Sequence, residues 1–271
     1  MTAAQIKSAF SSIGEVDPSL LPASLTLKLL VTPSSLRYFV LSQTHQQVLF
    51  FGNYALHHVN QPQELAYRLE KIFEKDEVLQ LKFGQVLFGM DTPYSLVPSE
   101  MTLLFSDWQK QAQKLEAIGA DLVFERNDTL QQTAARLFGP LQTSHVVATF
   151  IKQLPATDYQ NKLLVQVSSD HLDIIRWNDN GGVDLLNRYE YQTATDFIYY
   201  VLLVCNDLKI DRESTELVLA GEVDIQSKIY DMCYRYFRNI SFIQKPEHLH
   251  FSKAFDIMPK HLNYHLYNLS A

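Results

Sequence analysis

One block of hydrophobic pattern occurs twice in this chain of 271 residues, at residues 25–90 and again at residues 161–222. Each copy reads as three strands, an amphipathic helix and a fourth strand, because alternating apolar residues give way to an apolar stripe at helical spacing. At an offset of 136 residues, the corresponding apolar positions are Leu27, Leu29, Val31, Leu36 and Tyr38 in the first copy and Leu163, Val165, Val167, Leu172 and Ile174 in the second. The repeat predicts two related lobes that face each other across a cleft.

The repeat also divides the chain into four segments. We expect residues 1–24 to form an N-terminal extension, residues 25–155 the first lobe, residues 156–247 the second lobe, and residues 248–271 a C-terminal tail with a short helix near residues 260–267. The sequence specifies the structure of the extension poorly, and Pro18 and Pro22 close it.

Between the two copies, the spacing of apolar residues predicts helices. Ser99 begins a helix that Gly119 closes, since Gly commonly ends a helix. Its apolar stripe is Met101, Leu104, Phe105, Trp108, Ala112 and Leu115. Asp128 with Gln131 begins a second helix that runs to about residue 138, and residues 145–154 form a third. Stripes of this kind are more typical of helices that face a core than of a cofactor site.

Local motifs indicate how the second copy is connected. Residues 178–182 contain the Asn-Asp-Asn of a calcium loop, but no glutamate follows at the closing position and Asn-Gly favours a hairpin, so we interpret them as a turn. Thr193 with Asp196 forms a capping box. The helix that follows turns five residues inward: Phe197, Tyr200, Val201, Val204 and Leu208. Asp224 is expected to cap a further helix that reaches Ile240.

Composition excludes several classes of protein. Hydrophobic residues make up 46% and charged residues 20%, which is typical of a globular protein. The net charge of −7, without any run of Lys and Arg, gives no attraction to nucleic acid. The longest apolar run, residues 197–205, is half the length of a membrane span, and residues 1–16 have no apolar core of signal-peptide length. Cys205 and Cys233 lie in apolar helical patterns, so we interpret them as buried apolar side chains and not as part of a disulfide scaffold. We therefore expect a cytoplasmic protein that does not insert into a membrane.

Histidines and tyrosines give few further candidates. His261 and His265 lie four residues apart, which puts both rings on one face of a helix. A metal site would need a third ligand and no glutamate completes a zinc motif, so we expect surface histidines in the tail and no metal ligand. Four tyrosines are expected to be exposed, where aromatic side chains favour protein interfaces: Tyr199, Tyr234, Tyr264 and Tyr267.

Four segments carry a family resemblance: Tyr94–Met101, Asn187–Tyr200, Leu217–Glu222 with the helix that follows, and Met258–Leu262. They resemble a family of uncharacterised bacterial proteins, known as a domain of unknown function, that has an actin-like fold. The wider superfamily includes actin, Hsp70 chaperones and sugar kinases. With the doubled block, the resemblance implies an α/β fold of two related βββαβα lobes with an interlobe cleft, the actin-like ATPase (ribonuclease H-like) architecture.

The resemblance also supplies a test of mechanism. Active members of the superfamily bind Mg-ATP between two β-hairpin turns, each of which usually has Asp followed by Gly. Here the first turn, residues 31–36, has neither, and it contains Pro33, which has no amide donor. The second turn, residues 167–172, has Asp170 but no Gly. The resemblance therefore implies that ATP hydrolysis has been lost.

Seven residues would contact a nucleotide if one binds: Ser34, Ser35, Ser168, Ser169, Asp170, Gly221 and Glu222. The superfamily's paired glycine beside the adenosine is reduced here to Gly221, which Glu222 follows. We assign no catalytic residue and expect no cofactor, with Mg-ATP as the alternative. Serine is also common in ordinary hairpin turns, so the four serines fit a turn without a ligand as well.

The sequence therefore supports two functional hypotheses. The first is a degenerate actin-like protein that does not hydrolyse ATP and acts as a protein-binding or assembly module, with an unknown protein partner or as a homo-oligomer and without nucleic acid. The second is an active ATPase or small-molecule kinase with atypical phosphate-binding turns. An open cleft that Asp170 faces would favour the enzyme, whereas apolar side chains filling the cleft would exclude it.

Overall fold

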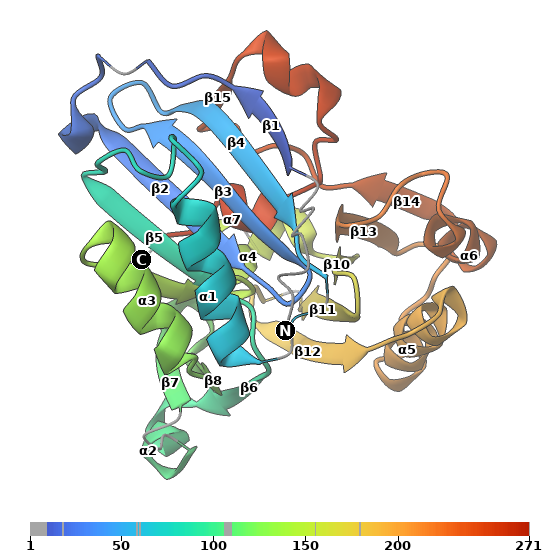
Figure 1. Ribbon diagram of the computed structural model, residues 1–271. Helices are drawn as coiled ribbons and strands as arrows, with labels where there is room; N and C mark the ends of the chain where they lie inside the picture. Colours follow the sequence, from blue (N-terminus) through green and yellow to red (C-terminus); the bar gives the residue numbers. More distant parts are fainter. Residues whose placement is uncertain are drawn as a thin grey trace.

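Two separate sheets carry the repeated block, one in each lobe (Figure 1). The computed structural model describes residues 10–270 except 18, 58, 60, 106–109, 155 and 179. The first sheet has the order β1-β4-β3-β2-β5-β9, and β15 also pairs with β4. Its strands are β1 (Phe10–Gly14), β2 (Leu25–Val31), β3 (Ser35–Ser42), β4 (Gln47–Ala55), β5 (Gln85–Met90), β9 (Gln142–His145) and β15 (His250–Phe251). The second sheet, of order β12-β11-β10-β13-β14, consists of β10 (Lys162–Val167), β11 (His171–Trp177), β12 (Val183–Glu190), β13 (Glu216–Gly221) and β14 (Asn239–Phe242).

Helices flank both sheets. The longer ones are α1 (Pro62–Phe73) and α3 (Asp128–Phe138) in the first lobe, and α5 (Ala194–Asp207) and α6 (Lys228–Tyr236) in the second. Shorter helices are α2 (Thr102–Phe105), α4 (Ala148–Gln153) and α7 (Tyr264–Tyr267). A third, small sheet of order β6-β8-β7 consists of β6 (Tyr94–Pro98), β7 (Lys110–Leu115) and β8 (Ala120–Glu125). Within the part of the chain that the structure describes, every helix is too short or too polar to cross a membrane.

The two lobes repeat each other strand for strand, as predicted. Strand β2 lies between antiparallel β3 and parallel β5, and β10 lies between antiparallel β11 and parallel β13. In the first hairpin turn, Thr32 N donates to Ser35 O at 2.8 Å, and in the second Ser168 N donates to His171 O at 2.9 Å. The offset of 136 residues therefore holds at the turns as well as along the strands.

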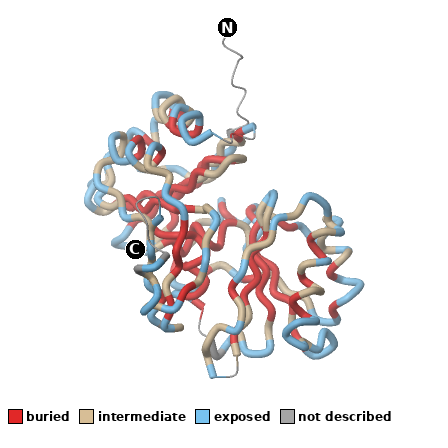
Figure 2. Tube along the Cα trace, turned by 90° about the horizontal axis from the view of Figure 1, so that it is seen from below, coloured by how far each residue is buried: buried red, intermediate tan, exposed pale blue. Residues whose placement is uncertain are grey.

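The central strands are buried on both faces, which explains their continuous apolar runs. On one face of β2, Leu27 lies in the same core as Leu69 of α1. On the other face, Leu30 lies in a separate core with Leu266 of α7. Figure 2 shows the buried strands inside both lobes and the exposed residues on the outer segments.

Both ends of the described chain join the first lobe. Strand β1, within the segment expected to be an extension, pairs antiparallel with β4. Beyond residue 248, β15 pairs with β4, and α7 contacts β2, β3 and β13. Tyr264 and Tyr267 are therefore buried, and their predicted exposure was wrong. Most apolar side chains of this segment pack in a core with residues of the first sheet, and Tyr264 lies in the core to which both sheets contribute.

The helix predicted from Ser99 to Gly119 is wrong. In the described part of this segment, a 3-10 turn (Ser99–Met101) and the short helix α2 precede β7, which pairs antiparallel with β8. Gln111 donates to Thr143 Oγ1 at 3.0 Å, and Gln113 donates to Ser144 Oγ at 2.8 Å. The inward face of β7 is therefore polar and has a period of two. The prediction followed apolar residues at helical spacing and did not consider the alternating polar residues. Trp108, which was part of that predicted stripe, lies outside the described residues.

The other predicted elements are largely confirmed. Helix α3 begins at Asp128, although its cap is Asn127, whose side chain accepts from Leu130 N. Residues 145–154 were predicted as one helix, but β9 ends at His145 and α4 begins at residue 148. The turn at residues 178–182 closes with Asn178 N donating to Gly182 O at 2.9 Å, while Asp179 lies outside the described residues.

In the second lobe, the capping box of Thr193 and Asp196 at the start of α5 is confirmed. The second lobe has its own core, the second core, between its sheet and helices α5 and α6. Four of the five residues expected to turn inward lie in or against this core, but Leu208 is exposed. Helix α6 begins four residues after the predicted cap, because the side chain of Ser227, and not Asp224, accepts from a helix amide, that of Tyr230.

The buried face of α5 can be tested with a carboxylate. Val201 is fully buried in the second core, so Val201→Asp should lower the free energy of unfolding by more than about 3 kcal/mol, because the charge would have no partner. Thr195→Asp, on the exposed face of the same helix, is the matched control and should stay close to wild type. Urea denaturation followed by circular dichroism measures both, and similar midpoints for the two variants would refute the assignment of this face.

Candidate functional site

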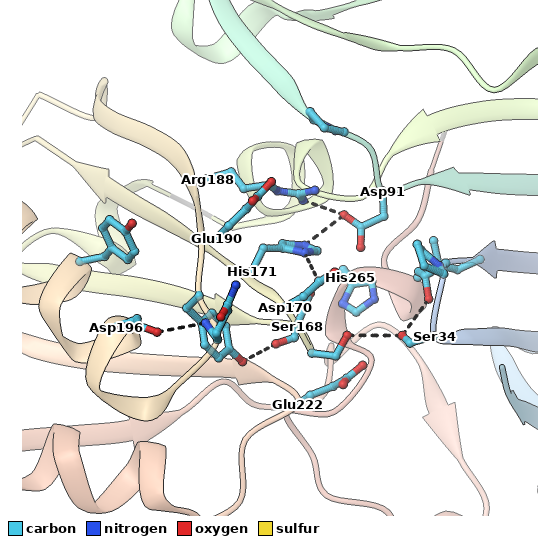
Figure 3. Close-up of a pocket in the computed structure, with 18 of the residues that line it drawn as sticks. Ser34, Asp91, Ser168, Asp170, His171, Arg188, Glu190, Asp196, Glu222 and His265 are labelled. Atoms are coloured by element: carbon cyan, nitrogen blue, oxygen red, sulfur yellow. Dashed lines mark hydrogen bonds and ion pairs between the residues drawn. The ribbon is translucent and has the colours of Figure 1, made fainter. Parts of the chain in front are cut away.

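A cavity of about 860 Å³ lies between the two lobes, where β2, β5, β10 and β13 end (Figure 3). The turns after β2 and β10 line it from the two lobes, and α7 contributes His265. Equivalent carboxyl ends of parallel strands therefore meet at one place, which is where α/β folds commonly bind ligands. The lining is largely polar and charged, so the cleft is not filled by apolar side chains.

The structure brings most of the predicted residues to this cavity. Those that line it are Ser34, Ser168, Ser169, Asp170 and Glu222. Ser35 does not, because its side chain is buried and its Oγ lies 3.1 Å from Thr32 Oγ1. Gly221 also lies outside the lining. It has φ +83°, and a Cβ there would lie 2.2 Å from Val167 O, so this position requires glycine for the backbone.

The two hairpin turns contact each other across the cleft. Ser169 Oγ donates to Ser34 Oγ at 3.4 Å. On the first-lobe side, Leu56 N donates to Ser34 O at 2.7 Å. On the second-lobe side, Tyr191 N donates to Asp170 O at 3.0 Å. Each turn is therefore hydrogen-bonded to the residue that follows the third strand of its own lobe. These bonds fix the positions of the turns that carry Ser34 and Ser169.

Arg188 is the centre of a buried ionic network beside the turns. From β12, it donates to Asp91 Oδ1 at 2.6 Å and to both carboxylate oxygens of Asp173 at 2.8 Å. Its guanidinium lies 5.2 Å from the ring centre of Tyr94, whose hydroxyl donates to Asp173 at 3.0 Å. His171 approaches Asp91 on its other side, with Nε2 and Oδ1 3.4 Å apart (Figure 3). The network joins the end of β5 in the first lobe to β11 and β12 in the second.

This network sets the charges of its members. Burial by itself would raise the pKa of Asp91, but Arg188 and His171 outweigh it and hold that pKa well below its ordinary value. Burial would lower the pKa of His171, yet Asp91 and Asp170 raise it to about 10. Near neutral pH, Asp91 is therefore ionised and His171 is protonated.

A second ion pair crosses the cleft, with its arginine on the first lobe and its carboxylate on the second. Arg37 of β3 binds Glu222, which follows β13. Leu30 pairs with Gly89 in the first sheet and Gln166 pairs with Ala220 in the second, so Asp91 and Glu222 stand at equivalent places in the repeat. Each lobe thus ends its parallel strand in a carboxylate that an arginine of the other lobe binds.

His265 lies in the cleft and not on the surface, which corrects the expectation for the tail histidines. It comes from α7, is only 5% exposed, and its Nδ1 has no hydrogen-bond partner among the described residues. Burial lowers the pKa of His265 to about 4, so its imidazole is neutral at pH 7. The neighbouring His261 is bound through Nε2 to Val223 O at 2.6 Å.

Sequence reasoning missed the charged residues that define the site: Arg37, Asp91, His171, Arg188 and His265. One signal was available, because an alignment of the fourth strands of the two copies places Asp91 against Glu222. The arginines carried no such signal, since a charged residue within a strand also fits an exposed face. Across the residues that the structure describes, no group of three His, Cys, Asp or Glu is arranged to hold a metal ion.

Residues 22–240 match the family described as Protein of unknown function (DUF3822). The chain belongs to this family. No curated protein matches it. Among solved structures, the chain is similar to a Bacteroides thetaiotaomicron protein with an actin-like ATPase fold and unknown function, at 14% identity and a TM-score of 0.70 over 82% of this chain and 91% of that one. It is also similar to the ethanolamine utilization protein EutJ of Carboxydothermus hydrogenoformans, at 10% identity and a TM-score of 0.51 over 94% of this chain and 91% of that one. The likeness establishes the actin-like ATPase fold that the repeat and the quoted segments predicted.

The network can be tested by removing its cation. Arg188→Gln should lower the free energy of unfolding by about 3 kcal/mol, because Asp91 and Asp173 would then be left buried and under-compensated. Arg238→Gln, which removes an exposed arginine 3.8 Å from Glu213, is the control and should change stability by less than about 0.5 kcal/mol. Chemical denaturation at pH 7 measures both, and equal effects would show that the network does not stabilise the fold.

The raised pKa of His171 predicts a pH-dependent contribution. Since that pKa rises from 6.5 to about 10 on folding, the stabilisation should be present in full below pH 6.5 and lost as the pH rises toward 10. The free energy of unfolding of wild type relative to His171→Gln should therefore shrink by roughly 1–3 kcal/mol between pH 6 and pH 10. Denaturation of both proteins at pH 6, 8 and 10 measures the difference, and a constant difference would contradict the assigned ion pairs.

Proposed function

We propose that this protein is an actin-like binding module that does not hydrolyse ATP and works by engaging a protein partner. The observation that carries the proposal is the 3.4 Å contact between Ser34 and Ser169. Active members of the superfamily hold phosphates between the corresponding turns, and in this chain the hydroxyls of the two turns are in contact there.

The charge of the cleft supports the same conclusion. Five carboxylates line the cavity: Asp91, Asp170, Glu190, Asp196 and Glu222. Against them stand Arg37, Arg188 and the protonated His171, and both arginines are already paired with carboxylates. Mg-ATP is still an anion, and it would add negative charge to a cleft whose lining is already net negative, which disfavours its binding.

The residues present do not fit Mg-ATP well. Neither turn has the glycine that lets backbone amides approach phosphates closely, and Pro33 removes one donor. Asp91 is bound by Arg188, and Asp170 accepts from His171 Nδ1 at 2.8 Å. Carboxylates that are already paired with cations are poor ligands for a hydrated magnesium ion.

Protein binding is supported by aromatic and aliphatic side chains on the second lobe. Tyr199 is 58% exposed and Tyr234 is 71% exposed, as expected from the sequence, and Ile225 is exposed as well. Tyrosines are enriched in protein interfaces. The proposed partner is another protein or a second copy of this chain. The thiols of Cys205 and Cys233 are free and buried, which is compatible with the cytoplasmic location that we propose.

One observation favours the alternative of an active ATPase or small-molecule kinase. Asp170 lines an open, polar cleft, and its side chain is 61% exposed. This is the arrangement that would favour an enzyme. If Mg-ATP does bind, Asp170 is the residue placed to organise the metal, after exchange of its bond to His171.

The assay that separates the two functions is ATP turnover. Purified wild-type protein with Mg-ATP should release no more phosphate than the Ser168→Ala, Asp170→Ala double variant. A magnesium-dependent rate that disappears in the double variant would refute the proposed function and favour the enzyme. A parallel thermal-shift titration detects binding without turnover, since a ligand at about 100 times its Kd stabilises a protein by about 2.7 kcal/mol. Nucleotide binding without turnover would indicate a nucleotide-sensing switch.

A further inference from the structure

We infer that the interlobe cleft binds a cationic group on a flexible stem, the side chain of an arginine or lysine that a partner protein inserts. This inference rests on the proposed binding function and names the chemistry of the partner. It assigns a ligand to the cavity from the groups that remain free once the ion pairs between the lobes are formed.

The first of these groups are carboxylates. Glu190, at the end of β12, lines the cavity and is exposed, and its side chain has no ion-pair or hydrogen-bond partner in the described part of the chain. Asp170 also lines the cavity with most of its side chain exposed, although one of its oxygens accepts from His171 Nδ1. Both cationic arginines of the cavity are already paired, so an incoming cation would meet free negative charge and little opposing positive charge.

The second free group is His265, an independent observation. His265 lines the cavity, its Nδ1 is buried and has no partner among the described residues, and leaving such an atom unpaired costs free energy. A neutral imidazole offers one donor and one acceptor nitrogen. In Figure 3 its ring lies among the labelled residues of both lobes. With the ring proton on Nε2, Nδ1 is the acceptor nitrogen, and an ammonium or guanidinium group can donate to it.

The third feature is an aromatic wall. Tyr199 and Tyr200 of α5 line the same cavity with ring centres 5.3 Å apart, and Tyr200 stacks on Tyr189 of β12 at 4.9 Å. Tyrosine faces attract cations, and most strongly a guanidinium. The wall also gives apolar surface to the alkyl stem of a lysine or arginine. Carboxylates and aromatic faces together select a cation on an alkyl stem over a bare metal ion.

The test uses short peptides and a matched pair of variants. Tetra-arginine amide is titrated by calorimetry into the wild-type protein, Glu190→Gln and Glu77→Gln, at low and at physiological salt. Glu77 is exposed and lies outside the cavity. Binding to wild type should weaken roughly three- to tenfold in Glu190→Gln, stay unchanged in Glu77→Gln, and weaken at higher salt. Equal binding by all three proteins, or binding of tetraglutamate as tight as that of tetra-arginine, would overturn the inference.

Two further arms identify the source of the cation and separate the proposals. Binding of spermidine without binding of tetra-arginine would show that the cleft takes a free polyamine, and it would overturn the assignment to a partner side chain. The same samples are assayed for Mg-ATP turnover. Absence of peptide binding without turnover refutes only this inference, whereas turnover that Ser168→Ala, Asp170→Ala abolishes refutes the proposed function.

Discussion

The bond between Arg188 and Asp91 joins the two lobes at a buried point, and the rest of the cleft depends on it. Arg188 comes from β12 and also binds Asp173, while Asp91 follows β5 of the first lobe. Charges removed from water are tolerated only where partners surround them. The ends of β5, β11 and β12 are therefore fixed relative to one another by the need to keep these three charges paired. His171 and Tyr94 take their positions from the same network.

The C-terminal segment adds a second constraint on the lobes. Lys28 of β2 donates to Tyr267 O at 2.5 Å, and Gly221 N at the end of β13 donates to His261 O at 3.0 Å. The segment is thus bonded to the parallel strands of both lobes, and its apolar side chains fill the core beneath β2. Separation of the lobes would break these bonds together with the ion pair between Arg37 and Glu222. Groups from three parts of the chain therefore bridge the two lobes around the cleft.

The side chains that line the cleft without forming a bond between the lobes include acidic and aromatic ones. Arg37 and Arg188 form ion pairs between the lobes, whereas Glu190 and the aromatic wall of α5 form none among the described residues. Hydrogen-bond acceptors and negative charge therefore face the cavity. The actin-like fold does not depend on the residue types in the two hairpin turns, because strands and helices supply the hydrophobic cores.

The sequence by itself determined the duplicated fold, because strand and helix periods are local and the same apolar positions recur at residues 27 and 163. It also placed Ser34, Ser168, Ser169, Asp170 and Glu222 at the cleft, since the ends of equivalent strands must meet there. It misassigned β7, where the polar inward face of Gln111 and Gln113 carries no apolar signal. Only the tertiary structure decided that Arg37 and Arg188 bind carboxylates of the opposite lobe, and that His265 lies in the cleft. These contacts join residues far apart in the chain, and their geometry depends on how the two packed lobes meet, which no local pattern encodes.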